Sequence, residues 1–319
     1  MPPRRRKIRR FFKAFLPILL LLLAAVGALT GWSVYEATHP ARRPYMVTPE
    51  QYARLSDRGL RATEENWATR DGTPARGWLL RGAEGAPAVV LVHAYGANRS
   101  WLFNLGVKLN EATNFTVLWP DLRGHGPDQS NGWTTLGARE ADDVLDAIGF
   151  LRSLRTTRGT PLVGDYIGLY GVELGAYAAL RAIAQDRQIR AVVLDSVPAS
   201  PDDLLRAAIE KRIGVSFAPL NRLVQIGARL FLLGRYDAFA SCEAARRAEG
   251  EKVLLLAGRD APRWQRSTAE LARCFPPSVE VELHDNLSLS GLNVVSAPAE
   301  QGEAYDRRVI EFFARALSD

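Results

Sequence analysis

The chain has 319 residues, of which 47% are hydrophobic and 24% are charged, and its formal net charge is +6. This length and hydrophobic fraction allow one large folded domain with an appendage and exclude a disordered chain. Seven arginines and lysines between residues 4 and 13 exceed the whole net charge, so the rest of the chain is close to neutral. A globular nucleic-acid-binding face therefore has no charge support, and we expect no nucleic-acid partner.

Residues 14–35 form an apolar stretch of 22 residues without a charge. As a helix it is long enough to cross the roughly 30 Å hydrocarbon layer of a bilayer. The basic segment 1–13 favours the cytoplasmic side, so the sequence predicts a single-pass membrane protein with a cytoplasmic N-terminus and an extracytoplasmic main domain. A cleaved signal peptide is the alternative, because residues 26–28 (VGA) offer small side chains near a cleavage position.

Residues 36–60 are predicted to be a juxtamembrane linker. The linker ends in a short helix, because Thr48 is a capping residue and Pro49 follows it in the first helical turn. Residues 61–69 and 75–81 are strand-like and flank the turn sequence DGTP, which predicts an opening β-hairpin.

Apolar runs that alternate with helical stretches follow the hairpin. Strands are predicted at 88–93, 115–119, immediately before residue 171, 189–195, 252–257 and 279–283, and helices at 98–111, 137–154, from residue 174 to about 184, and 304–316. Continuous apolar runs are typical of parallel strands covered on both faces. The alternation predicts an α/β fold over residues 61–319 with a mostly parallel, doubly wound sheet, and residues 200–250 are predicted to form a small helical cap.

One polar residue, Glu173, lies between Gly171 and Gly175 where the third parallel strand meets its helix. The spacing matches the G-x-S-x-G nucleophile elbow, with glutamate in place of serine. In an elbow the central residue has a strained backbone, and the flanking glycines prevent collisions with it. The scaffold for a nucleophile is therefore predicted without its usual nucleophile.

Five motifs together resemble the α/β-hydrolase superfamily, in particular its membrane-anchored serine-hydrolase-like members. They are HAYGANRS (93–100), DLRGHG (121–126), GVELG (171–175), LDS (194–196) and LLLAGRD (254–260), and the resemblance covers roughly residues 60–319. It implies an α/β-hydrolase fold in which an elbow serine attacks an acyl carbon, an acid orients a histidine, and backbone N–H groups stabilise the oxyanion.

The resemblance implies three catalytic positions in this chain, and two of them hold a residue other than the one that the family uses. Glu173 stands in place of the serine, Asp260 matches the acid, and Leu289 occupies the position of the histidine. His284, five residues before Leu289, is the single candidate for a displaced base. The backbone N–H groups of Tyr95 and Leu174 are the candidate oxyanion-hole donors.

The other polar residues of these motifs are predicted to be structural. His93 is expected to shape its own loop, and Asp121 and His125 to bond the local backbone. The same interpretation applies to Asp195 and Ser196. Cys242 and Cys274 fit neither a disulfide framework nor a metal cluster, and whether they pair is left open.

The leading hypothesis is a membrane-anchored pseudohydrolase that binds a small acyl-like ligand or a partner protein, because two catalytic groups are lost independently. The alternative is an active hydrolase that uses Glu173 with Asp260 and His284. A pure scaffold whose cap side chains fill the pocket is a third hypothesis. We expect no cofactor and no metal, although convergence of Glu173, Asp260 and His284 would give a divalent cation oxygen ligands.

Overall fold

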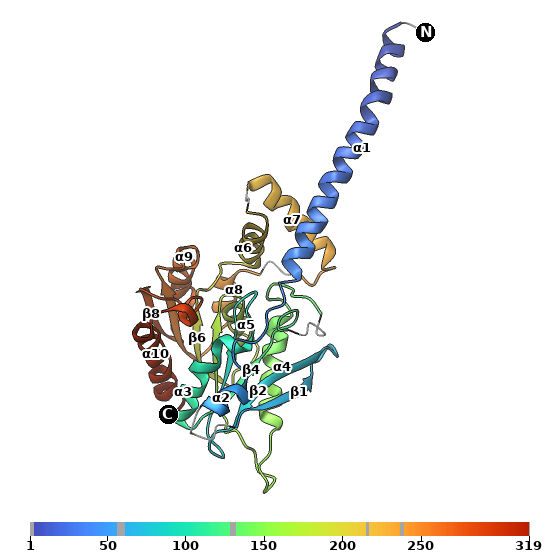
Figure 1. The fold of residues 1–319 in the computed structure, drawn as a ribbon. Coiled ribbons are helices and arrows are strands. Elements are labelled where there is room, and N and C mark those ends of the chain that lie inside the picture. Colours follow the sequence, from blue (N-terminus) through green and yellow to red (C-terminus); the bar gives the residue numbers. More distant parts are fainter. Residues whose placement is uncertain (1–2, 56–60, 128–131, 215–216, 237–238, 319) are drawn as a thin grey trace. The chain divides into compact units, whose positions relative to one another are not determined.

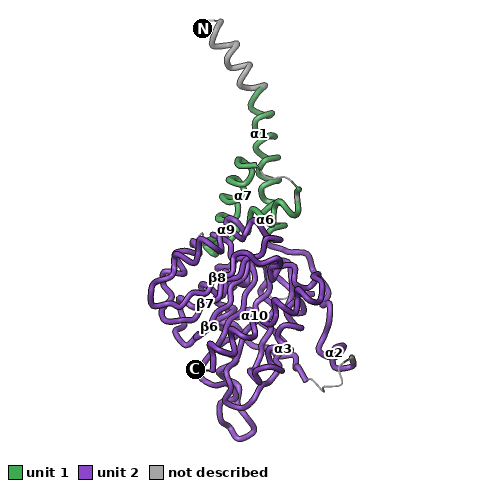
Figure 2. The backbone as a smooth tube through the Cα atoms, turned by 90° about the vertical axis from the view of Figure 1, so that its left-hand side faces the viewer, with its two compact units in different colours: residues 1–37, 205–236 green, residues 38–204, 237–319 purple. Residues whose placement is uncertain are grey.

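The computed structural model describes residues 3–55, 61–127, 132–214, 217–236 and 239–318. The chain divides into two compact units (Figure 2). Unit 1 comprises residues 1–37 and 205–236, and unit 2 comprises residues 38–204 and 237–319. The middle of the predicted cap segment thus belongs to the same unit as the N-terminal helix, whereas the linker belongs to unit 2 from residue 38 on.

Unit 1 is built around α1 (Pro3–Thr38), whose segment Phe15–Thr38 is long and apolar enough to cross a membrane. A signal sequence near the N-terminus would pass the same test. Two cap helices accompany it: α6 (Pro201–Ile213), which enters unit 1 at Leu205, and α7 (Ala218–Phe231). Near the end of α1, the Arg212 Nε donates a hydrogen bond to the Glu36 carboxylate at 2.8 Å.

Unit 2 contains an eight-stranded sheet in the order β1-β2-β4-β3-β5-β6-β7-β8 (Figure 1). The strands are β1 (Thr63–Ala68), β2 (Pro74–Leu80), β3 (Ala88–Val92), β4 (Thr116–Pro120), β5 (Ile167–Val172), β6 (Ile189–Asp195), β7 (Lys252–Gly258) and β8 (Glu280–Leu287). The hairpin β1–β2 is antiparallel and joins β4 in antiparallel fashion, and the strands from β4 to β8 are parallel. The predicted hairpin and mostly parallel sheet are confirmed.

Helices cover both faces of the sheet, as a doubly wound sheet requires. They are α2 (Pro49–Leu55), η1 (Arg99–Leu102), α3 (Phe103–Thr113), α4 (Glu140–Ser153), α5 (Leu174–Ile183), α8 (Ser241–Ala245), α9 (Pro262–Leu271), η2 (Ala272–Cys274), η3 (Val294–Ser296) and α10 (Ala299–Ser318). Helix α3 contacts α10, and α5 contacts both α4 and α8. Aromatic residues of α3 and α10, among them Phe103 and Phe313, are buried in one apolar core cluster with strand residues such as Val89 and Trp119.

The segment after α1 is bound to unit 2 by polar contacts. The Tyr45 hydroxyl donates to Asp121 Oδ2 at 2.6 Å, and the Arg99 guanidinium stacks on the Tyr45 and Trp78 rings at 4.8 and 4.6 Å. Arg99 itself is 1% exposed. Because a buried guanidinium needs its partners, these contacts attach the predicted linker to the domain.

A disulfide joins Cys242 of α8 to Cys274 of η2. The two cysteines, whose pairing the sequence leaves open, are therefore bonded to each other within unit 2. The bond ties α8, in the last part of the predicted cap segment, to the short η2 helix that follows α9.

Candidate functional site

The turn between β5 and α5 has the backbone of a nucleophile elbow. Glu173 adopts φ 52° and ψ −107°, a region that residues with a side chain rarely occupy. The turn has no room for side chains beside it, because a Cβ on Gly171 would lie 2.5 Å from the Gly175 carbonyl carbon, and one on Gly175 would lie 2.3 Å from the Val92 carbonyl oxygen. Only glycine therefore fits at these two positions, as the spacing of the elbow motif predicts.

The Glu173 side chain accepts a hydrogen bond at the predicted oxyanion hole. The Tyr95 N–H donates to Glu173 Oε2 at 3.1 Å, and both residues are partly buried. Leu174 is the first residue of α5, where N–H groups have no acceptor within the helix. A carboxylate is favoured at this helix end, because the helix dipole adds to the attraction of the N–H groups.

The acid and histidine positions also come together, although the histidine is absent. Asp260 follows β7 and accepts hydrogen bonds from Ser290 Oγ at 3.0 Å and Asn293 Nδ2 at 2.8 Å. Both donors follow Leu289 in the chain, and Leu289 is 8% exposed and belongs to the apolar core cluster. The loop that would carry a catalytic imidazole therefore places an apolar side chain in the core.

His284 lies apart from the elbow. It is on β8, where its Nε2 bonds to Glu282 Oε1 at 2.7 Å, and the register aligns Val172, Asp195, Leu256 and His284 across four neighbouring strands. Three strand spacings put its Cα roughly 14 Å from the Cα of Val172, the residue before Glu173. The structure thus does not bring His284 to Glu173, and the three residues proposed for a divalent cation do not converge. Within the described ranges, no group of three or more His, Cys, Asp or Glu residues could hold a metal ion.

Two buried histidines lie behind the oxyanion-hole loop. His93 Nε2 accepts the Leu122 N–H at 3.1 Å and its Nδ1 lies 2.9 Å from the Ala94 carbonyl oxygen, so Nδ1 carries the proton of a neutral ring. Burial lowers the pKa of His93, and burial followed by repulsion from His93 lowers the pKa of His125 to about 3. His125 Nδ1 bonds to the Arg123 carbonyl oxygen, as predicted for the local backbone. Both rings remain neutral at pH 7.

Asp121 makes longer-range contacts than predicted. It receives the Arg99 N–H at 2.9 Å as well as the Tyr45 hydroxyl, so it joins three segments of the chain rather than only its own turn. The prediction of purely local bonding was therefore wrong for Asp121.

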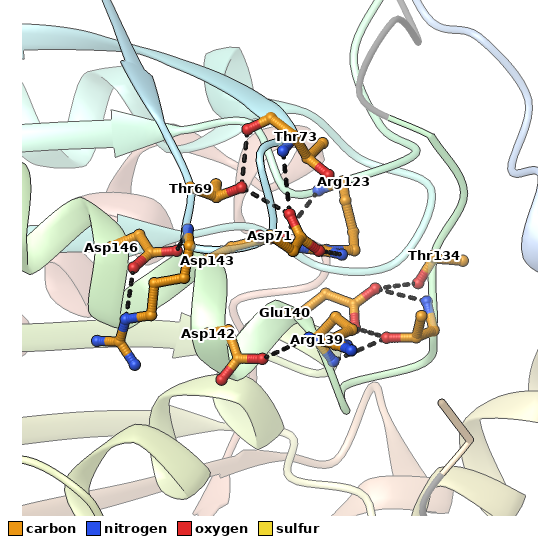
Figure 3. A network of polar contacts seen from close by, with 12 residues as sticks. Thr69, Asp71, Thr73, Arg123, Thr134, Arg139, Glu140, Asp142, Asp143 and Asp146 are labelled. Carbon is orange, nitrogen blue, oxygen red and sulfur yellow. Dashed lines mark hydrogen bonds and ion pairs between the residues drawn. The ribbon is translucent and has the colours of Figure 1, made fainter. Parts of the chain in front are cut away.

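The loop that begins at Asp121 is fixed by a network of charged side chains (Figure 3). Arg123 forms ion pairs with the buried Asp143 on α4 and, at 2.9 Å, with Asp71 in the β1–β2 turn. Glu140 on α4 accepts from the Thr134 hydroxyl at 2.6 Å and from the Thr135 N–H at 2.8 Å. Burial raises the pKa of Asp143 to about 6. The network holds both ends of the loop against α4.

A second buried network lies directly under the elbow and was not predicted. Asp195 accepts hydrogen bonds from Ser196 Oγ at 2.6 Å, the Gly291 N–H at 3.0 Å and the Tyr305 hydroxyl at 2.8 Å. The Tyr170 and Tyr305 hydroxyls lie 2.9 Å apart. Burial raises the pKa of Asp195 to about 6. The Ser196 hydroxyl bonds the Asp195 side chain and not the backbone, and Asp195 links β6 to the loop after Leu289 and to α10, so the prediction of local backbone bonding was wrong for both residues.

Comparisons with known proteins agree with this fold. Residues 89–315 match the sequence model of the family described as the alpha/beta hydrolase family. Among curated relatives, a thiohydrolase from Aspergillus aculeatus is 25% identical over 41% of this chain and 40% of its own length. A polyketide transferase from Stachybotrys chlorohalonatus is 25% identical over 50% of this chain and 51% of its own length. The chain thus spans about half the length, or less, of these relatives.

Solved structures share the fold over most of this chain. An esterase from Pyrococcus furiosus superposes with a TM-score of 0.60 at 19% identity, covering 88% of this chain and 99% of the esterase. An alpha/beta hydrolase from Penicillium sp. sh18 gives a TM-score of 0.60 at 17% identity, covering 82% of this chain and all of that protein. Because the family match covers more than half of the sequence, the chain belongs to the α/β-hydrolase family.

Proposed function

We propose that this protein is a membrane-anchored α/β-hydrolase-fold protein that binds an acyl-like ligand at its elbow without cleaving it. The observation that carries the proposal is the hydrogen bond from the Tyr95 N–H to the Glu173 carboxylate. An oxyanion hole stabilises a tetrahedral intermediate only when its donors point at the position that the substrate oxygen will occupy. Here the protein's own carboxylate takes one of those donors.

The chemistry of the residues supports the same conclusion. A serine elbow forms an ester intermediate after histidine removes its proton, and water then cleaves that ester. A glutamate that attacked an ester would form an anhydride, and Leu289 supplies no proton transfer to resolve it. Asp260 therefore has no imidazole to orient, and its Oδ2 accepts hydrogen bonds from Ser290 and Asn293 instead.

An acyl-like ligand remains the best-supported class. Relatives named thiohydrolase and polyketide transferase share part of this sequence, and an esterase shares the fold. A partner protein on the same face is the other binding partner that the proposal allows.

The proposal also places unit 2 outside the cytoplasm. The apolar segment Phe15–Thr38 acts as a retained anchor, with the preceding basic residues on the cytoplasmic side. The disulfide between Cys242 and Cys274 supports this side, because disulfides persist mainly in oxidising compartments.

The test is an ester panel applied to the full chain in detergent. We expect no turnover of p-nitrophenyl acetate or butyrate above the buffer rate, no labelling by a fluorophosphonate, and a rise in thermal midpoint when p-nitrophenyl butyrate binds. Turnover by the unmodified chain that Glu173→Gln abolishes would refute the proposal and establish the Glu173 enzyme instead.

A matched pair of variants serves as the positive control. Glu173→Ser alone supplies the nucleophile without a base, whereas Glu173→Ser combined with Leu289→His supplies both residue types at the positions that the motifs indicate. We expect fluorophosphonate labelling and ester turnover from the double variant and much less from the single one. Equal rates in the two variants would contradict the assignment of Leu289 to the histidine position.

A further inference from the structure

Helix α7 carries an apolar stripe that faces away from its own unit. Leu223, Ile226 and Leu230 are 41%, 49% and 70% exposed, and their i, i+3, i+7 spacing puts them on one face of the helix. Phe217 before the helix and Leu233 after it extend the exposed apolar surface, at 53% and 86%. Large apolar side chains that gather in this way on a surface indicate an interaction site.

A second face of α7, roughly a third of a turn from the stripe, is buried. Leu220, Val224 and Ala228 are at most 6% exposed and repeat every four residues. Gly227, on the same side, approaches α1 so closely that a Cβ there would lie 2.8 Å from Thr30 Cγ2 and 3.2 Å from Val34 Cγ2. Helix α7 is therefore packed against α1 and apolar on two faces, whereas a helix that only covers a partner needs one apolar face.

The position of this contact along α1 determines what the outer stripe meets. At 1.5 Å per residue, a hydrocarbon layer of about 30 Å accommodates about 20 residues, so a span that begins at Phe15 reaches about Val34. The contact with Gly227 lies at Thr30 and Val34, in the last turns of that span. Trp32 and Tyr35 are about half exposed at the same level, and these are the residue types enriched at membrane interfaces.

The charges around the stripe also suit a lipid surface. Arg222 on α7 and Arg235 just after it are exposed and lie beside the apolar residues. A helix with an apolar stripe bordered by cations is typical of an interfacial helix, whose apolar face enters the boundary between headgroups and acyl chains. Anionic headgroups attract the arginines.

We propose that α7 is an interfacial helix whose stripe of Leu223, Ile226 and Leu230 inserts into the membrane beside α1. The stripe is thereby a second membrane-binding surface of the chain, in addition to the span itself. This inference rests on the proposed membrane anchor, because the depth of α7 is taken from the position of α1. It fixes α7 at the lipid surface.

The test uses single-cysteine labelling of the full chain reconstituted in liposomes that contain anionic lipid. The two native cysteines form a disulfide, so an introduced cysteine is the one that reacts with an environment-sensitive NBD dye. Leu223→Cys reports on the stripe, and Arg222→Cys, one residue and about 100° away on the same helix, is the matched control. Leu22→Cys reports on the span, and Arg158→Cys reports on an exposed loop of unit 2.

We expect the Leu223→Cys and Leu22→Cys labels to show blue-shifted emission, quenching by doxyl-labelled lipids and protection from iodide. The Arg222→Cys label should be less protected, and the Arg158→Cys label should be quenched by iodide. Protection at Leu22→Cys with iodide quenching at Leu223→Cys overturns the interfacial helix and leaves the anchor intact. Protection of Leu223→Cys from both quenchers also overturns it, because a protein then covers the stripe. Iodide quenching at Leu22→Cys refutes the anchor itself, and lipid quenching at Leu223→Cys would then support α7 independently.

Discussion

Replacing Glu173 by glutamine, alanine and glycine separates two contributions of this residue to stability. The first contribution is the hydrogen bond from the Tyr95 N–H to the carboxylate at the start of α5. The second is the cost of holding a residue with a side chain at φ 52° and ψ −107°. Glutamine removes the charge, alanine removes the whole polar group, and glycine removes the group and the backbone strain together.

The expected sizes follow from these contacts. A hydrogen bond to a charged group contributes about 1.5–3 kcal/mol and a neutral one about 0.5–1.5 kcal/mol, and partial exposure of Glu173 favours the lower values. Glu173→Gln should therefore lower the free energy of unfolding by about 1 kcal/mol and Glu173→Ala by about 2 kcal/mol. In Glu173→Gly, relief of the strained backbone raises the free energy of unfolding by about 1–3 kcal/mol relative to alanine. The larger conformational entropy that glycine loses on folding takes back about 0.5–1 kcal/mol of this gain.

We therefore expect Glu173→Gly to be more stable than Glu173→Ala by about 1 kcal/mol, although glycine is ordinarily the weaker residue. The assay is urea unfolding of the full chain in detergent, followed by tryptophan fluorescence, with the thermal midpoint as a second measure. If alanine is as stable as glycine, the turn is not strained and the elbow assignment fails. If glutamine is as stable as glutamate, the carboxylate does not act as a charged acceptor at the oxyanion hole.

Three further predictions concern the surroundings of the site. Burial raises the pKa of Asp195 to about 6 from an ordinary value of 3.8, so the folded state holds its proton more tightly. The stabilisation that follows is complete below pH 3.8 and is lost as the pH rises through 6, a change of up to about 3 kcal/mol in the free energy of unfolding. The urea midpoint should therefore fall less between pH 4 and pH 7 in Asp195→Asn than in the unmodified chain. Reduction of the disulfide between Cys242 and Cys274, 32 residues apart, should cost about 3–4 kcal/mol; dithiothreitol should lower the thermal midpoint of the unmodified chain but not that of a variant with serine at both positions. Arg123→Met should destabilise the chain by about 3–5 kcal/mol because it leaves Asp143 buried without its partner. Urea unfolding should show a smaller loss of stability in the double variant with Asp143→Leu, and equal losses of stability in the two variants would contradict the pairing.

The strands and the elbow were predictable because their signals are local. Five-residue apolar runs such as residues 88–92 and 116–120 mark buried parallel strands wherever they occur. The glycines at 171 and 175 report a steric requirement of the turn itself. Helix α9 was not predicted, because its sequence PRWQRSTAEL has few apolar residues and buries only Trp264, Thr268 and Leu271. A helix with so few apolar residues does not stand out in a sequence, even though its buried residues repeat at helical spacing.

The candidate site was predictable in outline but not in its contacts. Position in the motifs indicated Glu173, Asp260 and Leu289, whereas the bond from Tyr95 to Glu173 depends on a side-chain conformation that spacing does not specify. His284 shows that closeness in the sequence does not predict closeness in space. It is only five residues from Leu289, yet it lies on an edge strand and bonds to Glu282. Long-range networks have no sequence signal of their own. Asp195 and Tyr305 are 110 residues apart, and only the fold brings them together.

The proposed losses of the serine and the histidine would have related physical consequences at this elbow. The Tyr95 N–H and the start of α5 favour a negative charge whether or not a reaction occurs there, because both present backbone donors. In a hydrolase that charge appears only transiently, on the substrate, whereas here the Glu173 side chain itself accepts the Tyr95 N–H. A return of histidine at Leu289 alone would therefore not restore hydrolysis, since the carboxylate would still occupy the Tyr95 donor. The hydrogen bond from the Tyr95 N–H to Glu173, more than the absence of a serine, is therefore the reason for proposing a binding site here rather than a catalytic one.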